Sequence, residues 1–155
     1  MMQVIDRSLL AELCAEATAS PRGRKNRNFH TSDDASAHRL LIAMQPGSYV
    51  VPHCHLDPRK AETLVCVQGR LGLVVFGERG VVQQAIVLEP SGHALGVDIP
   101  PGSVHSVVAL VADTVFLEAK AGPYCPLSES EMASWAPREG EAGVADYELQ
   151  LRRLF

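Results

Sequence analysis

The sequence is short of aromatic side chains and of charge, and it has no long apolar run. Aromatic residues make up 5% of its 155 residues and charged residues 21%, while 46% are hydrophobic. No stretch approaches the roughly 18 consecutive apolar residues of a membrane-spanning helix. The first residues also lack the charged and then apolar plan of a signal peptide. The hydrophobic content is too high for a disordered chain. We therefore expect one cytoplasmic globular domain with no membrane partner.

The sequence also lacks a surplus of positive charge and any CxxC pair. Its formal net charge of -4 argues against a general nucleic-acid-binding protein. The four cysteines are widely separated, and a chain of this length does not need covalent cross-links to build a core. We expect free thiols rather than a disulfide framework, at Cys14, Cys54, Cys66 and Cys125.

Short β-branched runs bounded by Gly or Pro dominate the middle of the chain. Their connections are too short for crossover helices, which favours an antiparallel, all-β sandwich or barrel. Before them, Ser8 is a candidate cap for a helix that Pro21 ends. The predicted strands are 39–44, 62–67, 71–76, 81–88, 106–111 and 114–120. The predicted single domain, 1–155, comprises an N-terminal helix and basic lead-in (1–37), a barrel (38–121) and a C-terminal extension (122–155) with a short helix from about Asp146.

Three histidines and a glutamate occur in a pattern that suits a metal site. Side chains alternate between the two faces of a strand, so His53 and His55 are expected on one face and Cys54 on the other. Glu62 follows on the next predicted strand. Pro101-Gly102 fits the centre of a type II turn, which would bring His105 onto a later strand.

The order of these motifs, GxxxxxHxH, then Glu and Gly, then PxGxxH, resembles that of the cupin superfamily. The resemblance implies a small jelly-roll β-barrel that holds one divalent metal through His53, His55, Glu62 and His105. Two alternatives stay open at this stage. Glu62 orients an imidazole instead of binding the metal, or Asp57 replaces it as a ligand.

A wider resemblance covers nearly the whole chain and is to the WbuC-type cupin-fold metalloproteins. That family is known mainly from bacterial polysaccharide gene clusters, and its reaction is not established. The resemblance therefore implies a fold and a metal but no substrate. It rests on residues 20–30, 39–43, 45–49, 122–124 and 135–137.

Nitrogen and oxygen ligands suit Fe, Mn, Ni, Cu or Zn as the divalent ion, and ligand type alone does not choose among them. The leading hypothesis is a metal-dependent enzyme of oxygenase or isomerase type that acts on a small polar molecule such as a sugar derivative. The alternative is a non-catalytic protein in which the metal anchors a small ligand. A metal-free epimerase, with Tyr49 as its acid, is a third reading.

The lead-in between Arg22 and Arg27 carries four basic residues within six positions. It is either a binding segment for an anionic small molecule or a solvated basic turn. Tyr49 shares the expected face of His53 and is either a cavity residue or a core aromatic. We also expect a homodimer that pairs through sheet edges. The candidate ligand-binding residues are Arg24, Arg27, Asn28, His30 and Tyr49.

Overall fold

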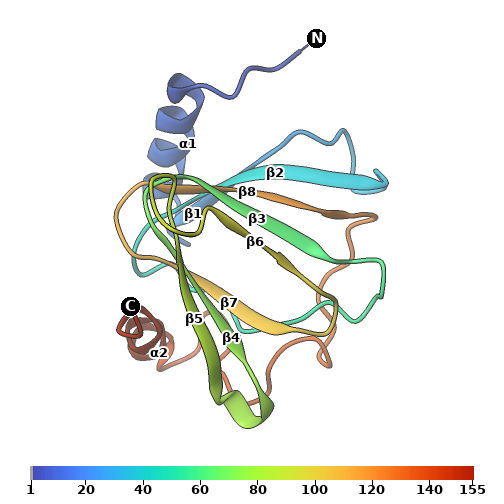
Figure 1. Cartoon of the computed structure of the whole chain (residues 1–155), viewed down its shortest axis with the longest axis vertical. Helices are drawn as coiled ribbons and strands as arrows, with labels where there is room; N and C mark the ends of the chain where they lie inside the picture. Colours follow the sequence, from blue (N-terminus) through green and yellow to red (C-terminus); the bar gives the residue numbers. More distant parts are fainter. Residues whose placement is uncertain (1) are drawn as a thin grey trace.

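The computed structural model describes residues 2–155 and shows two antiparallel sheets that face each other (Figure 1). In that part of the chain, eight strands form the two sheets. The larger sheet has the order β1-β2-β8-β3-β6 and the smaller has the order β5-β4-β7. The five strands of the larger sheet are β1 (Arg24–Asn28), β2 (Ala37–Met44), β8 (Thr114–Ala121), β3 (Glu62–Gln68) and β6 (Gly96–Ile99). The three of the smaller sheet are β5 (Val82–Leu88), β4 (Leu71–Phe76) and β7 (Val104–Ala109).

Each sheet is covered on its outer side by one helix. The helix α1 (Arg7–Ala19) packs Leu13 and Ala17 against Leu41 and Val115 of the larger sheet. Its cap is Asp6, whose Oδ1 accepts a hydrogen bond from the Leu9 amide at 2.9 Å, so the predicted cap at Ser8 is wrong by two residues.

The second helix, α2 (Val144–Arg152), lies against the smaller sheet, where Leu151 packs on Val74 and Val108. A single 3₁₀ turn, η1 (Glu78–Gly80), closes the hairpin between β4 and β5. Neither α-helix of the described residues is long and apolar enough to cross a membrane.

The predicted all-β barrel is confirmed, and each predicted strand is present. Two further strands were missed by the sequence analysis. The first, β1, is formed by polar residues at a sheet edge, where pairing with β2 rather than apolar alternation decides the conformation. The second, β6, is four residues long and pairs with β3.

The space between the sheets holds an apolar core that gives way to a cavity. Leu64 and Phe116 come from the larger sheet, and Leu73 and Val107 from the smaller. The thiols of Cys14, Cys54 and Cys66 are buried, Cys125 is exposed, and no disulfide joins cysteines within residues 2–155.

Two glycines make turns that matter for the site. Gly102 has φ +81°, the left-handed conformation that a type II turn requires before β7. Gly69 has φ +76° in the turn between β3 and β4, and a Cβ there would lie 2.8 Å from the Cα of Thr114. Gly102 therefore leads the chain into the strand that carries His105, and Gly69 lets β3 turn close to the start of β8.

Candidate metal centre

His53 and His105 are brought side by side by their own backbones. The amide of each donates to the carbonyl of the other, at 3.0 and 2.9 Å, which makes an isolated antiparallel bridge. Their rings lie 4.8 Å apart, centroid to centroid. The next residue, Cys54, donates its amide to Glu131 instead, and His55 accepts from the Gly102 amide at 2.8 Å. The segment is thus extended but belongs to neither sheet, and it is held by this bridge and by a second antiparallel bridge between His53 and Met132.

Both imidazoles are held by a carbonyl two residues earlier in the chain. Nδ1 of His53 lies 2.9 Å from the Val51 carbonyl oxygen, and Nδ1 of His105 lies 2.9 Å from that of Ser103. Because a carbonyl only accepts, each Nδ1 carries the hydrogen of the neutral ring. Each Nε2 is then left with a free lone pair, as a metal ligand requires.

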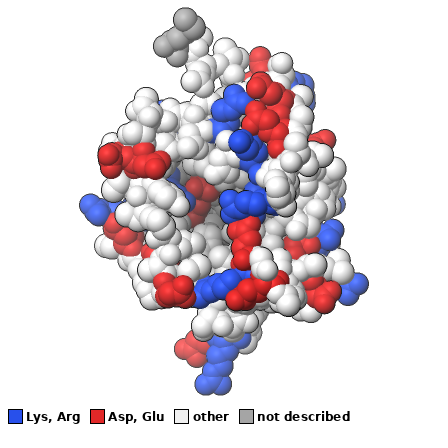
Figure 2. All heavy atoms as spheres, turned by 180° about the vertical axis from the view of Figure 1, so that it is seen from behind, with Lys and Arg blue, Asp and Glu red and all other residues white. Residues whose placement is uncertain are grey.

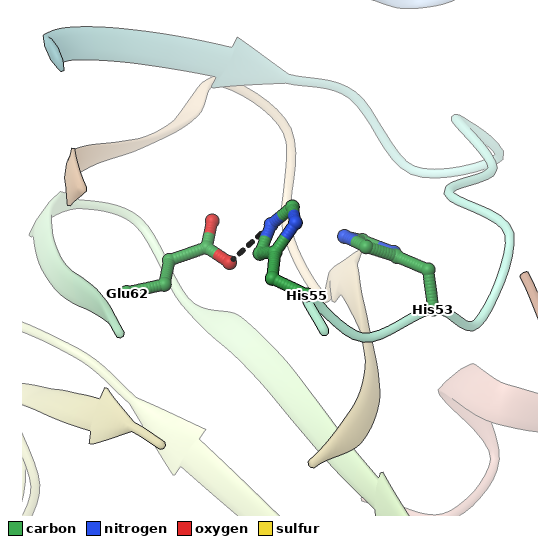
Figure 3. A group of neighbouring side chains, drawn as sticks. All are labelled: His53, His55 and Glu62. Carbon is green, nitrogen blue, oxygen red and sulfur yellow. Dashed lines mark ion pairs between the residues drawn. The ribbon is translucent and has the colours of Figure 1, made fainter. Parts of the chain in front are cut away.

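His55 and Glu62 face each other without forming a hydrogen bond (Figure 3). Their Nε2 and Oε2 atoms are 3.4 Å apart, and Nε2 of His105 is 3.4 Å from the same oxygen. Within residues 2–155, Nε2 of His55 and Oε2 of Glu62 are buried with no hydrogen-bond partner. Such unpaired buried groups are costly unless something else satisfies them.

Burial and neighbouring charges shift the pKa values of the cluster in different directions. Burial, together with the neighbouring His105, lowers the pKa of His53 to about 4, so this ring is neutral at neutral pH. Burial raises the pKa of Glu62, but the His105 and His55 imidazoles and the Lys120 ammonium lower it well below the ordinary value. Burial likewise lowers the pKa of His105, while Glu62 raises it more, so the net shift is upward. The opposite shifts of His105 and Glu62 have the same cause, which is the attraction between an imidazolium and a carboxylate at 3.4 Å.

The four side chains fit a divalent ion. The donor atoms of His53, His55 and Glu62 all lie within 4.8 Å of one another, and His105 contacts Glu62. Three neutral imidazoles and one carboxylate are the donor set that first-row divalent metals accept. An ion placed among them would also satisfy the two unpaired atoms. These residues would hold the metal.

A cavity of about 600 Å³ opens beside this cluster. His53, Glu62 and His105 contribute to its wall, and the apolar remainder includes Leu64, Val107 and Phe116. A smaller cavity of about 180 Å³ touches His53 and His55 from another side. Figure 2 shows one face of the molecule hollowed near its centre, with basic and acidic side chains around the hollow.

Two polar residues of this cavity, Glu118 and Lys120 on β8, were missed by the sequence analysis. The Lys120 Nζ lies 2.7 Å from Glu118 Oε1 and 3.7 Å from Glu62 Oε1. Burial and the nearby Glu62 charge raise the pKa of Glu118 to about 7. The sequence does contain a sign of them. In the predicted strand 114–120, an acid and a base occupy alternate positions on the same face as the buried Phe116.

The predicted ligand-binding residues are spread over different parts of the molecule. Arg24 lines the large cavity and donates to the Tyr49 carbonyl at 2.9 Å and to Glu139 at 3.0 Å. Tyr49 is buried outside the cavity wall, and its hydroxyl donates to the Pro137 carbonyl at 2.8 Å. This contact places it in the core, the other role that the sequence allowed.

The remaining candidates lie away from the cavity wall. Arg27 forms ion pairs with Glu12 and Glu16 of α1, at 3.2 and 3.0 Å. Asn28 is an exposed residue at the end of β1. His30 stacks on His38, with ring centroids 3.9 Å apart. The basic lead-in is therefore divided, with Arg22, Arg24 and Lys25 at the cavity and Arg27 on the helix side.

The fold resembles several solved structures whose sequences are less than 20% identical to this one. KdgF from Halomonas sp. has a TM-score of 0.51 and 17% identity, over 66% of this chain and 81% of that one. The TT1209 protein from Thermus thermophilus has a TM-score of 0.55 and 19% identity, over 77% and 97%. Oxalate oxidase in complex with the substrate analogue glycolate has a TM-score of 0.51 and 18% identity, over 69% and 55%. At these identities the likeness establishes the cupin fold.

No curated protein matches the sequence. One family model does, over residues 5–88, which is more than half of the chain and includes α1, the two-histidine segment and Glu62. The chain has the cupin fold and belongs to the family described as Domain of unknown function (DUF6016).

Proposed function

We propose that this cupin binds one divalent metal through His53, His55, Glu62 and His105 and is a metal-dependent enzyme acting on a small polar molecule such as a sugar derivative. One observation carries the metal: Nε2 of His55 and Oε2 of Glu62 are buried, face each other and have no hydrogen-bond partner in the described structure. A fold does not normally leave two such atoms unpaired side by side unless a ligand binds both.

The chain's own residues prepare the site in two ways, and a bound metal would add a third contribution. The carbonyls of Val51 and Ser103 fix the rings of His53 and His105, so that each Nε2 is available. The cavity admits a small molecule beside the cluster, and its wall offers both polar and apolar side chains to that molecule. A bound divalent ion supplies Lewis-acid polarisation of a carbonyl or hydroxyl oxygen.

We also propose a pathway, a compartment and an oligomeric state for this protein. The sequence resemblance to WbuC-type proteins supports a role in bacterial polysaccharide metabolism in the cytoplasm. Pairing of two chains into a homodimer is supported by the open edges that β1 and β5 leave on the two sheets.

Metal content is the direct test. We expect protein purified without added metal to carry about one divalent ion per chain by inductively coupled plasma mass spectrometry. His105→Ala removes one ligand and should weaken metal affinity by more than about tenfold. His93→Ala is the matched control, because His93 is an exposed histidine that does not line the cavity.

Full occupancy in His105→Ala would show that the ligand set is wrong. If the wild-type protein took up none of the five candidate metals on dialysis, the metal-binding function itself would be excluded.

A further inference from the structure

The inner face of β8 is the unexpected part of the cavity. Phe116, Glu118 and Lys120 alternate along the strand and all line the cavity, whereas Val115 and Leu117 pack on the outer side toward α1. The strand thus places an acid and a base inside the barrel at two successive inward positions.

The Glu118–Lys120 ion pair adds little to the fold. Glu118 pairs in register with Leu40 of β2 and Leu64 of β3, which are apolar core residues. Glu118 and Lys120 lie on one strand, so their ion pair joins no separate elements. The other charged contact of Lys120 is with Glu62 on β3, at 3.7 Å, and it lies at the same cavity wall. Burying two charges costs several kcal/mol per ion before pairing, and apolar residues would pack there at least as well. A buried charged pair at a cavity wall is what ligand recognition requires.

The charge of the wall differs in sign from that of the whole chain. Four basic residues line the cavity (Arg22, Arg24, Lys25 and Lys120) and two acidic ones do (Glu62 and Glu118), although the chain as a whole carries -4. Glu139 pairs with Arg22 and Arg24 at the mouth, at 2.7 and 3.0 Å. Lys25 is exposed and forms no ion pair in the described part of the chain. A cleft of this charge raises the local concentration of anions.

We propose that the cavity binds a small hydroxy acid, whose carboxylate contacts the Lys120 ammonium and whose hydroxyl donates to Glu118. This inference rests on the proposed function, because it names the substrate class of the same cavity. The carboxylates of Glu62 and Glu118 on either side of Lys120 disfavour a dianion such as a phosphate monoester. A neutral polyol offers no negative charge to the Lys120 ammonium, so it gains nothing from the basic side of the cavity.

Three probes of the same carbon skeleton separate these cases: glycerate, glycerol and glycerol 3-phosphate. Each is titrated calorimetrically into Co²⁺-loaded protein at fixed pH and ionic strength, and the visible Co²⁺ absorption reports metal loading independently. We expect wild-type protein to bind glycerate at least about tenfold more tightly than either other probe. Lys120→Met should lose about tenfold or more in glycerate affinity while its Co²⁺ absorption persists.

Arg153→Gln is the control, because it removes one positive charge from the exposed end of α2. It should leave glycerate affinity unchanged. If Lys120→Met does not fold because Glu118 is left unpaired, the double variant Glu118→Gln/Lys120→Met removes both charges and should show the same loss.

Equal affinity for glycerate and glycerol, or unchanged glycerate affinity in a folded Lys120 variant that holds Co²⁺, would overturn the inference. Failure of wild-type protein to bind Co²⁺ or any other candidate metal would count against the proposed function instead. The same titrations of metal-free protein would then decide the role of Lys120 separately.

Discussion

The chain contains two clusters of stacked or facing histidines, and they differ in how their ring nitrogens are satisfied. In one, His30 and His38 stack, with Nδ1 of His30 lying 3.2 Å from the backbone of Arg39 and Nε2 of His38 lying 3.1 Å from the Asp33 carbonyl. In the other, His53, His55 and His105 surround Glu62, and two buried atoms lack partners in the described structure.

The difference separates a structural cluster from the candidate metal centre. Both are buried to a similar degree, since His38 is 4% exposed and His105 3%. Burial and proximity therefore do not distinguish them, whereas hydrogen-bond satisfaction does. The sequence around His38 predicts a surface or turn histidine, and this prediction is wrong because the ring is buried. It is buried because its ring packs between His30 and the backbone near Gly122.

Metal removal should give the largest difference in thermal stability between variants of the two clusters. A metal at about 1,000 times its dissociation constant stabilises the folded state by about 4 kcal/mol. We expect chelation to lower the thermal midpoint of wild-type protein and of His38→Ala by similar amounts, and that of His55→Ala by clearly less, because a missing ligand weakens metal binding. Differential scanning calorimetry with and without chelator measures this. If the thermal midpoint of wild-type protein does not change on chelation, the two clusters do not differ in metal binding.

Loss of the buried structural histidine should have the next largest effect. His38→Ala removes a buried ring, its stacking on His30 and a contact with the Asp33 carbonyl. We expect the free energy of unfolding to fall by about 2 kcal/mol, measured by urea denaturation of metal-free protein. Metal content should stay at the wild-type level. A loss of metal in this variant would mean that the two clusters are not independent.

The smallest effect should come from the outer member of that structural pair. His30 is half-buried, so His30→Ala should cost less than about 1 kcal/mol. It should leave both metal content and glycerate affinity unchanged, because His30 is absent from the cavity wall. Weaker glycerate binding in this variant would instead restore His30 as a ligand-binding residue.

The barrel and the residues of the candidate metal centre could be predicted because short-range patterns determine them. The HxH spacing and the Pro101-Gly102 turn are local features, and each acts through backbone geometry that a few residues specify. The position of β1 could not be predicted in this way. Its polar residues carry no apolar period, and the strand exists because β2 offers it an edge.

Glu118 and Lys120 show a second limit of structure prediction from the sequence. Residues 114–120 were predicted to form a strand, but alternation alone does not say which face of a strand points into the barrel when both faces are buried. The outward face of β8 is covered by α1, so both sets of side chains are largely buried. The inward set is defined by the register of β8 with β2 and β3, which is a tertiary property.

The register of β8 affects which substitutions can alter the cavity in the course of evolution. The candidate metal-holding residues come from the segment before β3, from the first residue of β3 and from β7, whereas the proposed ligand contacts come from β8. Substitutions at the inward positions of β8 alter the cavity wall without touching the loop and turn that aim the histidines. A protein built this way can therefore acquire a new ligand preference through substitutions on one strand while its three candidate metal-holding histidines keep their places.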